Sequence, residues 1–201
     1  MLLIGFAVFI FIKSMLYYRF SLGVFISIML LVPLSAILVF IFLGAEILAA
    51  LGRDPTLTGR TQLWGWGIDV ALQKPWLGWG YQAYMGSEHA QAYALTIPRF
   101  VNYDVPHFHN AYIQILVELG FLGFLFYFFT YMVVVGRLYI LSAYRQYMGL
   151  LPLLAILTLL LISSFFINTF FQYNDFSTIL FFISAITVSG NYTLTRSGVQ
   201  S

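Results

Sequence analysis

The chain has 201 residues, of which 61% are hydrophobic, 19% are aromatic and only 8% are charged. This composition excludes a soluble globular domain and is typical of a polytopic membrane protein. A net charge of +2 without a basic run excludes a nucleic-acid-binding protein, and the lack of cysteine excludes disulfides, thiolate-bound metals and cysteine nucleophiles.

The chain starts with apolar residues directly after Met1, without the basic segment and cleavage site of a signal peptide. We therefore expect no cleaved signal. The abrupt apolar start indicates instead that the chain is the C-terminal part of a longer protein.

Apolar runs predict four or five transmembrane helices, since crossing the hydrocarbon layer takes about 20 apolar residues. The runs cover 1–12, which is short, then 20–50, 110–136, 148–167 and 176–190. The predicted fold is therefore an all-α polytopic membrane protein. It divides into transmembrane helices at 1–50, a large loop with short helices at 51–109, three transmembrane helices at 110–190 and a tail at 191–201.

Basic residues in the short loops and the tail predict the orientation of these helices. They all fall on one side of the membrane, while the short turn at 168–175 on the other side has none; they are Lys13, Arg19, Arg137, Arg145 and Arg196. The positive-inside rule makes their side cytoplasmic. We therefore expect the large loop to be extracytoplasmic.

The large loop is predicted to hold helices of its own. Thr58 is suited to cap a helix from about Gly59 to Lys74. A glycine-rich turn over 75–81 follows, and a second short helix over 82–97 ends before Pro98.

His109 stands directly before the predicted helix 110–136. The free N–H groups and the dipole of a helix N-terminus favour an anion and disfavour an imidazolium. A neutral imidazole there suits the acceptance of a proton from an incoming hydroxyl. A loop histidine that only caps the helix fits the same position equally well.

Asn110, Gln114 and Glu118 recur every four residues and therefore line one face of this helix. Glu118 then lies about 12 Å, or two turns, below the membrane surface. We favour a buried, hydrogen-bonded or protonated glutamate that fixes helix packing. The polar stripe also fits a transporter, although the sequence lacks the paired broken helices and inverted repeats of that class.

Arg60 is a candidate phosphate ligand, because its guanidinium stays charged and offers a fork of donors. Trp64, one turn later, is placed to flank it by a cation–π contact. An interfacial arginine that meets lipid headgroups is the competing interpretation. Arg99 and Lys74 are weaker candidates of the same kind.

The pair His107 and His109 raises the question of a metal site. Zinc needs further ligands, and the candidates His89, Glu88 and Asp104 do not form a helical H-E-x-x-H frame. We therefore expect no metal.

The aromatic residues of the loop allow two interpretations as well. They suit stacking on sugar rings, but an interfacial belt also uses such residues; they are Trp76, Trp79, Tyr81 and Tyr84.

Three motifs in order resemble those of the O-antigen ligases and the O-antigen or exopolysaccharide polymerases (Wzy/WaaL-like). GRTQLW at 59–64 is similar to the family's G-R-x-x-x-W, and KPWLGWG at 74–80 to its K/R-P-x-x-G-x-G turn. His109-Asn110, followed after nine residues by GFLG at 120–123, is similar to H-[NSQ]-x9-G-x-x-[GTY]. The residues of the first two motifs look most similar to those of the exopolysaccharide polymerase branch.

The resemblance implies a membrane glycosyltransferase that needs no metal or cofactor. Its donor is an undecaprenyl-pyrophosphate-linked glycan, its acceptor a glycan or a lipid, and its place the outer face of the bacterial cytoplasmic (inner) membrane, among membrane lipids. His109 is the implied catalytic residue, and Arg60 the ligand of the donor pyrophosphate. Arg99, Trp64 and Asn110 complete the predicted substrate-binding residues.

Members of the family have more membrane helices than this chain. The resemblance therefore implies a missing N-terminal half or other polysaccharide-assembly proteins as partners. The leading interpretation is polymerisation of the glycan. The alternatives are an O-antigen ligase or protein O-oligosaccharyltransferase and, from other classes, a transporter subunit or an inactive fragment.

Overall fold

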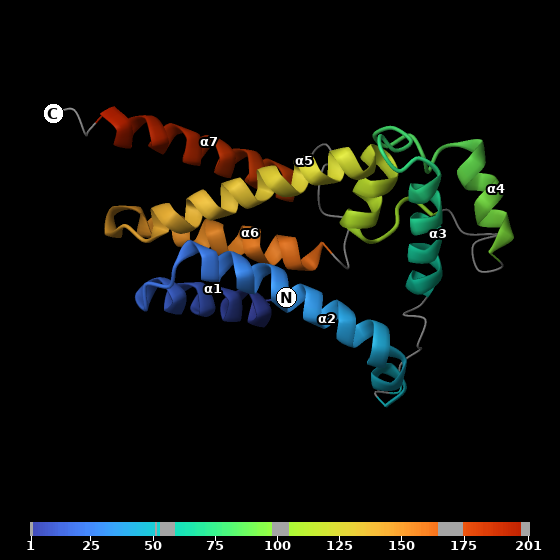
Figure 1. The fold of residues 1–201 in the computed structure, drawn as a ribbon, viewed down its shortest axis with the longest axis horizontal. Helices are drawn as coiled ribbons and strands as arrows, with labels where there is room; N and C mark the ends of the chain where they lie inside the picture. The colour runs from blue at the N-terminus through green and yellow to red at the C-terminus, as the bar shows by residue number, and fades with distance from the viewer. Residues whose placement is uncertain (1, 51, 53–58, 98–104, 165–174, 198–201) are drawn as a thin grey trace. The chain divides into compact units, whose positions relative to one another are not determined.

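The computed structural model describes residues 2–50, 52, 59–97, 105–164 and 175–197 (Figure 1). In these residues all regular secondary structure is helical, with seven α-helices and no strand, which confirms the predicted all-α class. The chain divides into two compact units. The first comprises Met1–Pro33, Phe129–Ser163 and Thr169–Ser201, and the second comprises Leu34–Phe128 and Ser164–Asn168.

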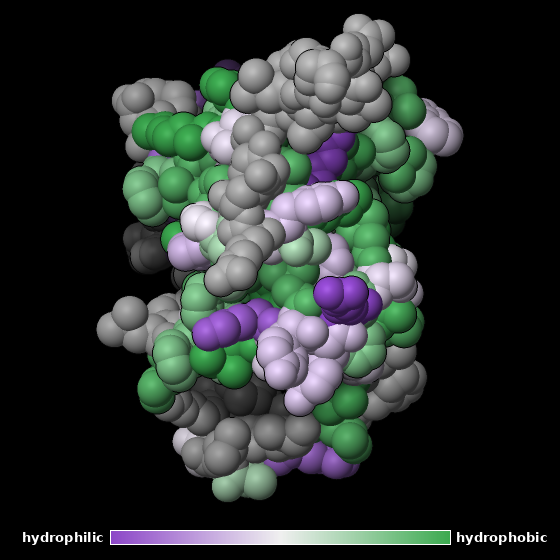
Figure 2. Space-filling view, turned by 90° about the vertical axis from the view of Figure 1, so that its left-hand side faces the viewer, coloured by the Kyte–Doolittle hydropathy of each residue, from purple (hydrophilic) through white to green (hydrophobic). Residues whose placement is uncertain are grey.

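The first unit is built from apolar helices. It holds α1 (Leu2–Tyr17), the start of α2 (Leu22–Ala50), the later part of α5 (Ala111–Ser142), the short 3-10 helix η3 (Arg145–Leu150), α6 (Leu151–Ser163) and α7 (Phe176–Ser197). The last helix extends past the predicted span 176–190. The face shown in Figure 2 is largely hydrophobic, with hydrophilic residues scattered over it.

Two tyrosines of α5 join the helices of this unit. Tyr139 donates a hydrogen bond of 2.8 Å to the carbonyl of Phe20, and its ring stacks on Phe25 at 4.3 Å. Tyr131 donates one of 2.5 Å to the carbonyl of Leu157 in α6. Each hydroxyl thus finds an acceptor although the surrounding residues are apolar, as a buried polar group requires.

One helix in the described part of the chain, α5, is long and apolar enough to cross a membrane. It is broken at Gly120, where φ is 66° and ψ is −169°. The predicted span 110–136 thus coincides largely with α5, but the break at Gly120 within it was not predicted. The part after the break, 121–142, is about 33 Å long at 1.5 Å per residue, which matches the hydrocarbon layer.

The other apolar stretches found among the described residues have 10–17 residues, although α2 as a whole covers Leu22–Ala50. They are Leu3–Tyr17, Leu22–Val32, Met148–Ser163 and Phe176–Gly190. The number of four or five spans accordingly stays a prediction.

The second unit contains the two helices predicted for the large loop. The first is α3 (Arg60–Gln73), preceded by Gly59, whose backbone is left-handed (φ 88°) and whose position has no side-chain cap. Thr58, the predicted cap, lies outside the described residues. The second is α4 (Glu88–Thr96), which begins later than predicted because Ser87 caps it by accepting the N–H of Ala90.

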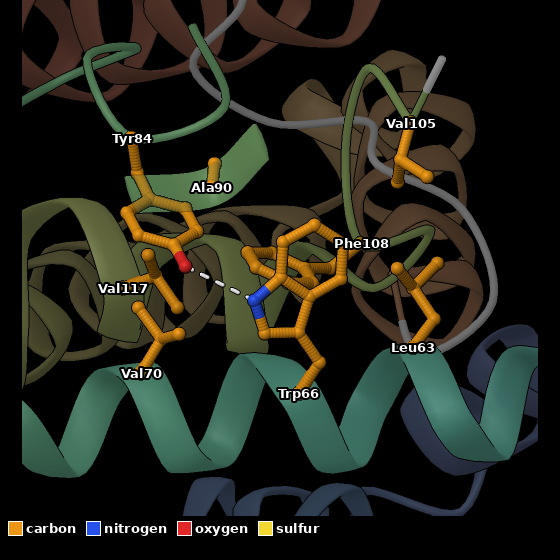
Figure 3. Close-up of a cluster of buried hydrophobic side chains, with 8 residues drawn as sticks. All are labelled: Leu63, Trp66, Val70, Tyr84, Ala90, Val105, Phe108 and Val117. Carbon is orange, nitrogen blue, oxygen red and sulfur yellow. Dashed lines mark hydrogen bonds between the residues drawn. The ribbon is translucent and has the colours of Figure 1, made fainter. Parts of the chain in front are cut away.

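An apolar cluster holds α3, α4 and the start of α5 together (Figure 3). Its largest member, Trp66, donates a hydrogen bond of 3.0 Å to the hydroxyl of Tyr84, so both polar atoms are satisfied inside the core. The cluster contains Leu63, Trp66, Val70, Tyr84, Ala90, Val105, Phe108 and Val117. Burial of this cluster fixes the loop as a folded unit.

The glycine-rich turn lies against the break in α5. Trp79 donates its backbone N–H to the carbonyl of Val117 at 2.8 Å, and Gly80 to that of Glu118 at 2.9 Å. In the other direction, the N–H of Phe121 donates to the carbonyl of Pro75 at 2.7 Å. The turn thus satisfies backbone groups that the helix break leaves without helical partners.

Glycine is required on both sides of this contact. Gly78 and Gly120 have positive φ, and a Cβ atom on either would overlap the facing backbone. The sequence motifs at 74–80 and 120–123 are therefore two halves of one backbone pairing, which we call the glycine clamp.

Candidate functional site

Phe108 anchors the segment that carries the two histidines. Its side chain is fully buried, and its backbone is held on both sides. The Phe108 N–H donates to Oε1 of Gln114 at 3.0 Å, and its carbonyl accepts from Nε1 of Trp64 at 3.1 Å. Residues 107–109 are therefore fixed to α3 and α5 at once.

His107 and His109 flank this anchor and lie against one another. Their ring centroids are 4.2 Å apart at an interplanar angle of 73°. His109 has a φ of 52°, which is uncommon for a residue other than glycine. Such backbone strain occurs preferentially at functional sites.

The pKa of His109 is lowered from its ordinary value. Burial is the main cause, and the charges of His107 and Arg60 add to it. The direction of this shift is the one that the expected neutral imidazole requires, and burial is its first cause. The effect of Arg60 also shows that the structure brings these two residues into electrostatic range, from the start of α3 and from the segment before α5.

Arg60 is the first residue of α3 and is half-buried. Trp64 is one turn further, and its indole N–H is directed to the carbonyl of Phe108. The cation–π contact seen in this unit joins Lys74 to Trp79, with the ammonium 3.9 Å from the ring centroid. Trp64 thus links α3 to the histidine segment.

Asn110 caps α5. Its Oδ1 accepts the backbone N–H groups of Tyr112 at 3.0 Å and Ile113 at 3.1 Å. The capping role considered for His109 therefore belongs to Asn110, and the histidine ring is left for other contacts. The substrate-binding role of Asn110 stays a prediction.

Gln114 and Glu118 form a buried pair, each only 7% exposed. Nε2 of Gln114 donates to Oε1 of Glu118 at 2.6 Å. The backbone of Gln82 also hydrogen-bonds the carboxylate of Glu118. The expected buried, hydrogen-bonded glutamate is confirmed, and its depth of about 12 Å below the membrane surface stays a prediction.

Two of the loop aromatics belong to the protein interior. Tyr84 is buried, and the indole N–H of Trp79 donates to the carbonyl of Val70 at 3.1 Å. Trp76 and Tyr81 are exposed, at 63% and 48%. For these two exposed rings, stacking on sugars and a place in the interfacial belt both stay predictions.

The described residues contain no group of three or more histidine, cysteine, aspartate or glutamate side chains able to hold a metal ion. His89 lies elsewhere in the unit, with Nδ1 3.3 Å from the hydroxyl of Tyr84 and its ring 4.8 Å from that of Trp79. Arg99 and Asp104 lie outside the described residues.

An apolar groove of about 290 Å³ runs between α3, the glycine-rich turn and α5. It reaches from Gly67, which lies against Phe108, to Phe121, the first residue after the helix break. Its wall is formed by Gly67, Ile68, Ala71, Leu72, Pro75, Trp76, Ile113, Leu116 and Phe121.

The residues missed by the sequence analysis are those that hold the site in place. Phe108 was not considered, and Gln114 was noted only as part of a polar stripe. The signal for Gln114 was its four-residue spacing from both Asn110 and Glu118, which puts a two-sided amide between a helix cap and a carboxylate.

Comparisons with known proteins agree with the three motifs. Residues 1–128 match a family model described as O-antigen ligase (Wzy_C). The exopolysaccharide production protein ExoQ of Rhizobium meliloti (strain 1021) is 44% identical over 78 residues, which are 38% of this chain and 18% of ExoQ. No solved structure was found to match. Since the family match covers well over half of the chain, this membrane protein belongs to the O-antigen ligase family.

Proposed function

We propose that this chain carries the donor-handling site of a membrane glycosyltransferase that joins undecaprenyl-pyrophosphate-linked glycan units into an exopolysaccharide. The observation that carries the proposal is His109 within electrostatic range of Arg60, with its pKa lowered by burial and by the charges of His107 and Arg60. The family match and the similarity to an exopolysaccharide production protein support the same chemistry.

The pair provides the two groups that such a transfer needs. The acceptor hydroxyl loses its proton to the imidazole of His109 as its oxygen bonds to the anomeric carbon of the donor sugar. The bond from that carbon to the pyrophosphate oxygen breaks, and the lipid pyrophosphate leaves with the bonding electrons. The guanidinium of Arg60 binds the oxygens on which this negative charge gathers.

The apolar groove supports a lipid-linked donor. It is lined almost wholly by apolar side chains and ends at Phe121, where the membrane-length part of α5 begins. A hydrocarbon chain entering from the membrane meets no polar group along this wall.

We also propose that the second unit faces the outside of the cytoplasmic membrane. The basic residues of the short loops support this orientation by the positive-inside rule. A site on that side has access to exported lipid-linked glycans. An N-terminal half with further membrane helices, or other polysaccharide-assembly proteins, are proposed as partners.

Ligation is the second candidate, because the matching family model is described as O-antigen ligase. Both reactions use the same donor and differ in the acceptor. In the purified full-length protein, a lipid-linked glycan supplied as donor and acceptor yields a ladder of longer chains if the protein polymerises. Transfer to lipid A core or to a protein acceptor alone, with no ladder, identifies a ligase instead. No transfer to any of these acceptors contradicts the proposed enzyme class.

A further inference from the structure

A chain of hydrogen bonds runs from Glu118 to the histidine segment. Glu118 accepts Nε2–H of Gln114 at 2.6 Å, and Oε1 of Gln114 accepts the backbone N–H of Phe108 at 3.0 Å. Both side chains are nine-tenths buried, so water does not replace these partners at low cost.

The carboxylate decides which way the amide of Gln114 points. Glu118 accepts hydrogen bonds both from Gln114 and from the backbone of Gln82, so Gln114 turns its NH₂ toward Glu118. Its oxygen then faces Phe108, where the backbone offers an N–H. With the amide reversed, two acceptors would face each other on one side and two donors on the other.

We propose that Glu118 and Gln114 are positioning residues that hold His109 in its reactive placement through the backbone of Phe108. Phe108 is the residue before His109, and its carbonyl is held independently by Trp64. Fixing the two peptide groups on either side of the Phe108 Cα defines the backbone from which the strained His109 projects, at φ 52°. Glu118 in turn is fixed by the glycine clamp through its own carbonyl and by the backbone of Gln82.

This inference rests on the proposed function only for its kinetic consequence. The placement of His109 is tested without any substrate. Diethyl pyrocarbonate modifies neutral imidazole, and mass spectrometry resolves the rates at the three histidines. The rate at His109 relative to His89, which does not touch the chain of hydrogen bonds, reports on placement in one and the same molecule.

The decisive variants exchange the two side chains. Gln114→Glu places two carboxylates against one another, removes the donor toward Glu118 and releases the segment. The double variant Gln114→Glu with Glu118→Gln reverses the polarity: the new carboxylate accepts from Phe108 and from the new amide, whose oxygen accepts from Gln82. Gln91→Glu, on the exposed face of α4, makes the same substitution away from the site and serves as the control.

We expect the relative rate at His109 to rise severalfold in Gln114→Glu, because the half-buried ring is released, and to return in the double variant. In transfer assays, kcat falls about tenfold to a hundredfold in the single variant with KM little changed, as for misplacement of a reacting group, and the double variant recovers it. If Gln114→Glu does not accumulate in membranes, Gln114→Ala removes both the donor toward Glu118 and the acceptor for Phe108 without adding a charge, and the same rise is expected.

An unchanged labelling ratio in Gln114→Glu and Gln114→Ala overturns the inference, as does failure of the double variant to restore it. The third outcome is a labelling ratio that changes in Gln114→Glu and returns in the double variant, while the wild-type protein transfers no glycan. This outcome supports the positioning role and contradicts the proposed function. The two ideas are thereby separated.

Discussion

At the scale of single residues, the candidate site contains a histidine whose pKa is lowered. Burial and the charges of His107 and Arg60 lower the pKa of His109, so it remains able to accept a proton where an ordinary histidine is charged. Arg60 thus lowers the pKa of His109, and in the proposed reaction it also binds the donor pyrophosphate.

Replacement of His109 by alanine is expected to lower glycan transfer about 10²- to 10⁴-fold, the usual cost of removing a general base. His107→Ala and His89→Ala are expected to be milder, and EDTA to have no effect. The measurement is transfer from purified lipid-pyrophosphate glycan, with membrane insertion of each variant checked in parallel. Equal losses at His107 and His109, rescued by zinc, would replace the base with a metal site.

The pH dependence of kcat/KM follows from the lowered pKa of His109. Activity is lost as the pH falls and the base is protonated, so the acidic limb has its midpoint below the ordinary histidine pKa of about 6.5. Arg60→Ala removes a charge that lowers this pKa, so the limb moves to higher pH. Arg60→Lys keeps the charge, and the limb stays in place. A limb that does not move in Arg60→Ala contradicts the pairing.

Arg60 is also expected to contribute through its geometry. Arg60→Ala should reduce transfer by about 1.5–3 kcal/mol, or roughly ten- to a hundredfold, the range for a charged hydrogen bond. Arg60→Lys should lie between alanine and wild type, because lysine keeps the charge but loses the fork. Unchanged polymer length and yield in Arg60→Ala, at normal protein level, would contradict donor binding.

At the scale of elements, the glycine clamp joins the glycine-rich turn to the early part of α5. Its hydrogen bonds link the backbone of 75–80 to that of 117–122, and two glycines with positive φ allow the approach. Substitution at either glycine therefore acts on the backbone itself, with no flexible side chain available to move aside.

Gly120→Ala is expected to destabilise the protein, since its φ of 66° and ψ of −169° are open essentially to glycine alone. The cost is about 1–3 kcal/mol for the strain, with the overlap against Trp76 in addition. Gly65→Ala is the matched control: it lies on α3 with open space around it, and alanine there should stabilise by about 0.5–1 kcal/mol. Thermal unfolding in detergent compares the two, and equal midpoints would contradict the clamp.

The local elements were predictable from the sequence, but their pairing was not. The helix at 60–73 and the turn after it follow from glycine and proline signals that act over a few residues. Gly120 stands inside an apolar run, where a straight helix is the simplest reading, and its partner Gly78 is far away in the chain. Backbone pairing between two such segments leaves no periodicity to detect. The same holds for Phe108, because an anchoring backbone has no side-chain signature.

At the scale of the whole molecule, the membrane topology remains the main prediction. Single cysteines distinguish the two sides cleanly, because the natural chain has none. A cysteine on each side must be exposed, which excludes the buried Ser142, and must not remove a helix cap, which excludes Ser87. The exposed positions Gln91 and Ala143 meet both conditions. In intact cells, a membrane-impermeant maleimide should label Gln91→Cys and leave Ala143→Cys unmodified. Labelling at 143 alone would reverse the orientation and move the site to the cytoplasmic side.

All four tryptophans of the chain, at positions 64, 66, 76 and 79, lie in the second unit. Tryptophan fluorescence therefore comes from the second unit, which also carries the histidines. The first unit does not contribute to it. Trp64 donates to the carbonyl next to His109, whereas Trp66 is buried in the core. The unmodified protein thus contains its own spectroscopic probe of this unit, and its emission separates local melting of the unit from loss of helix followed by circular dichroism.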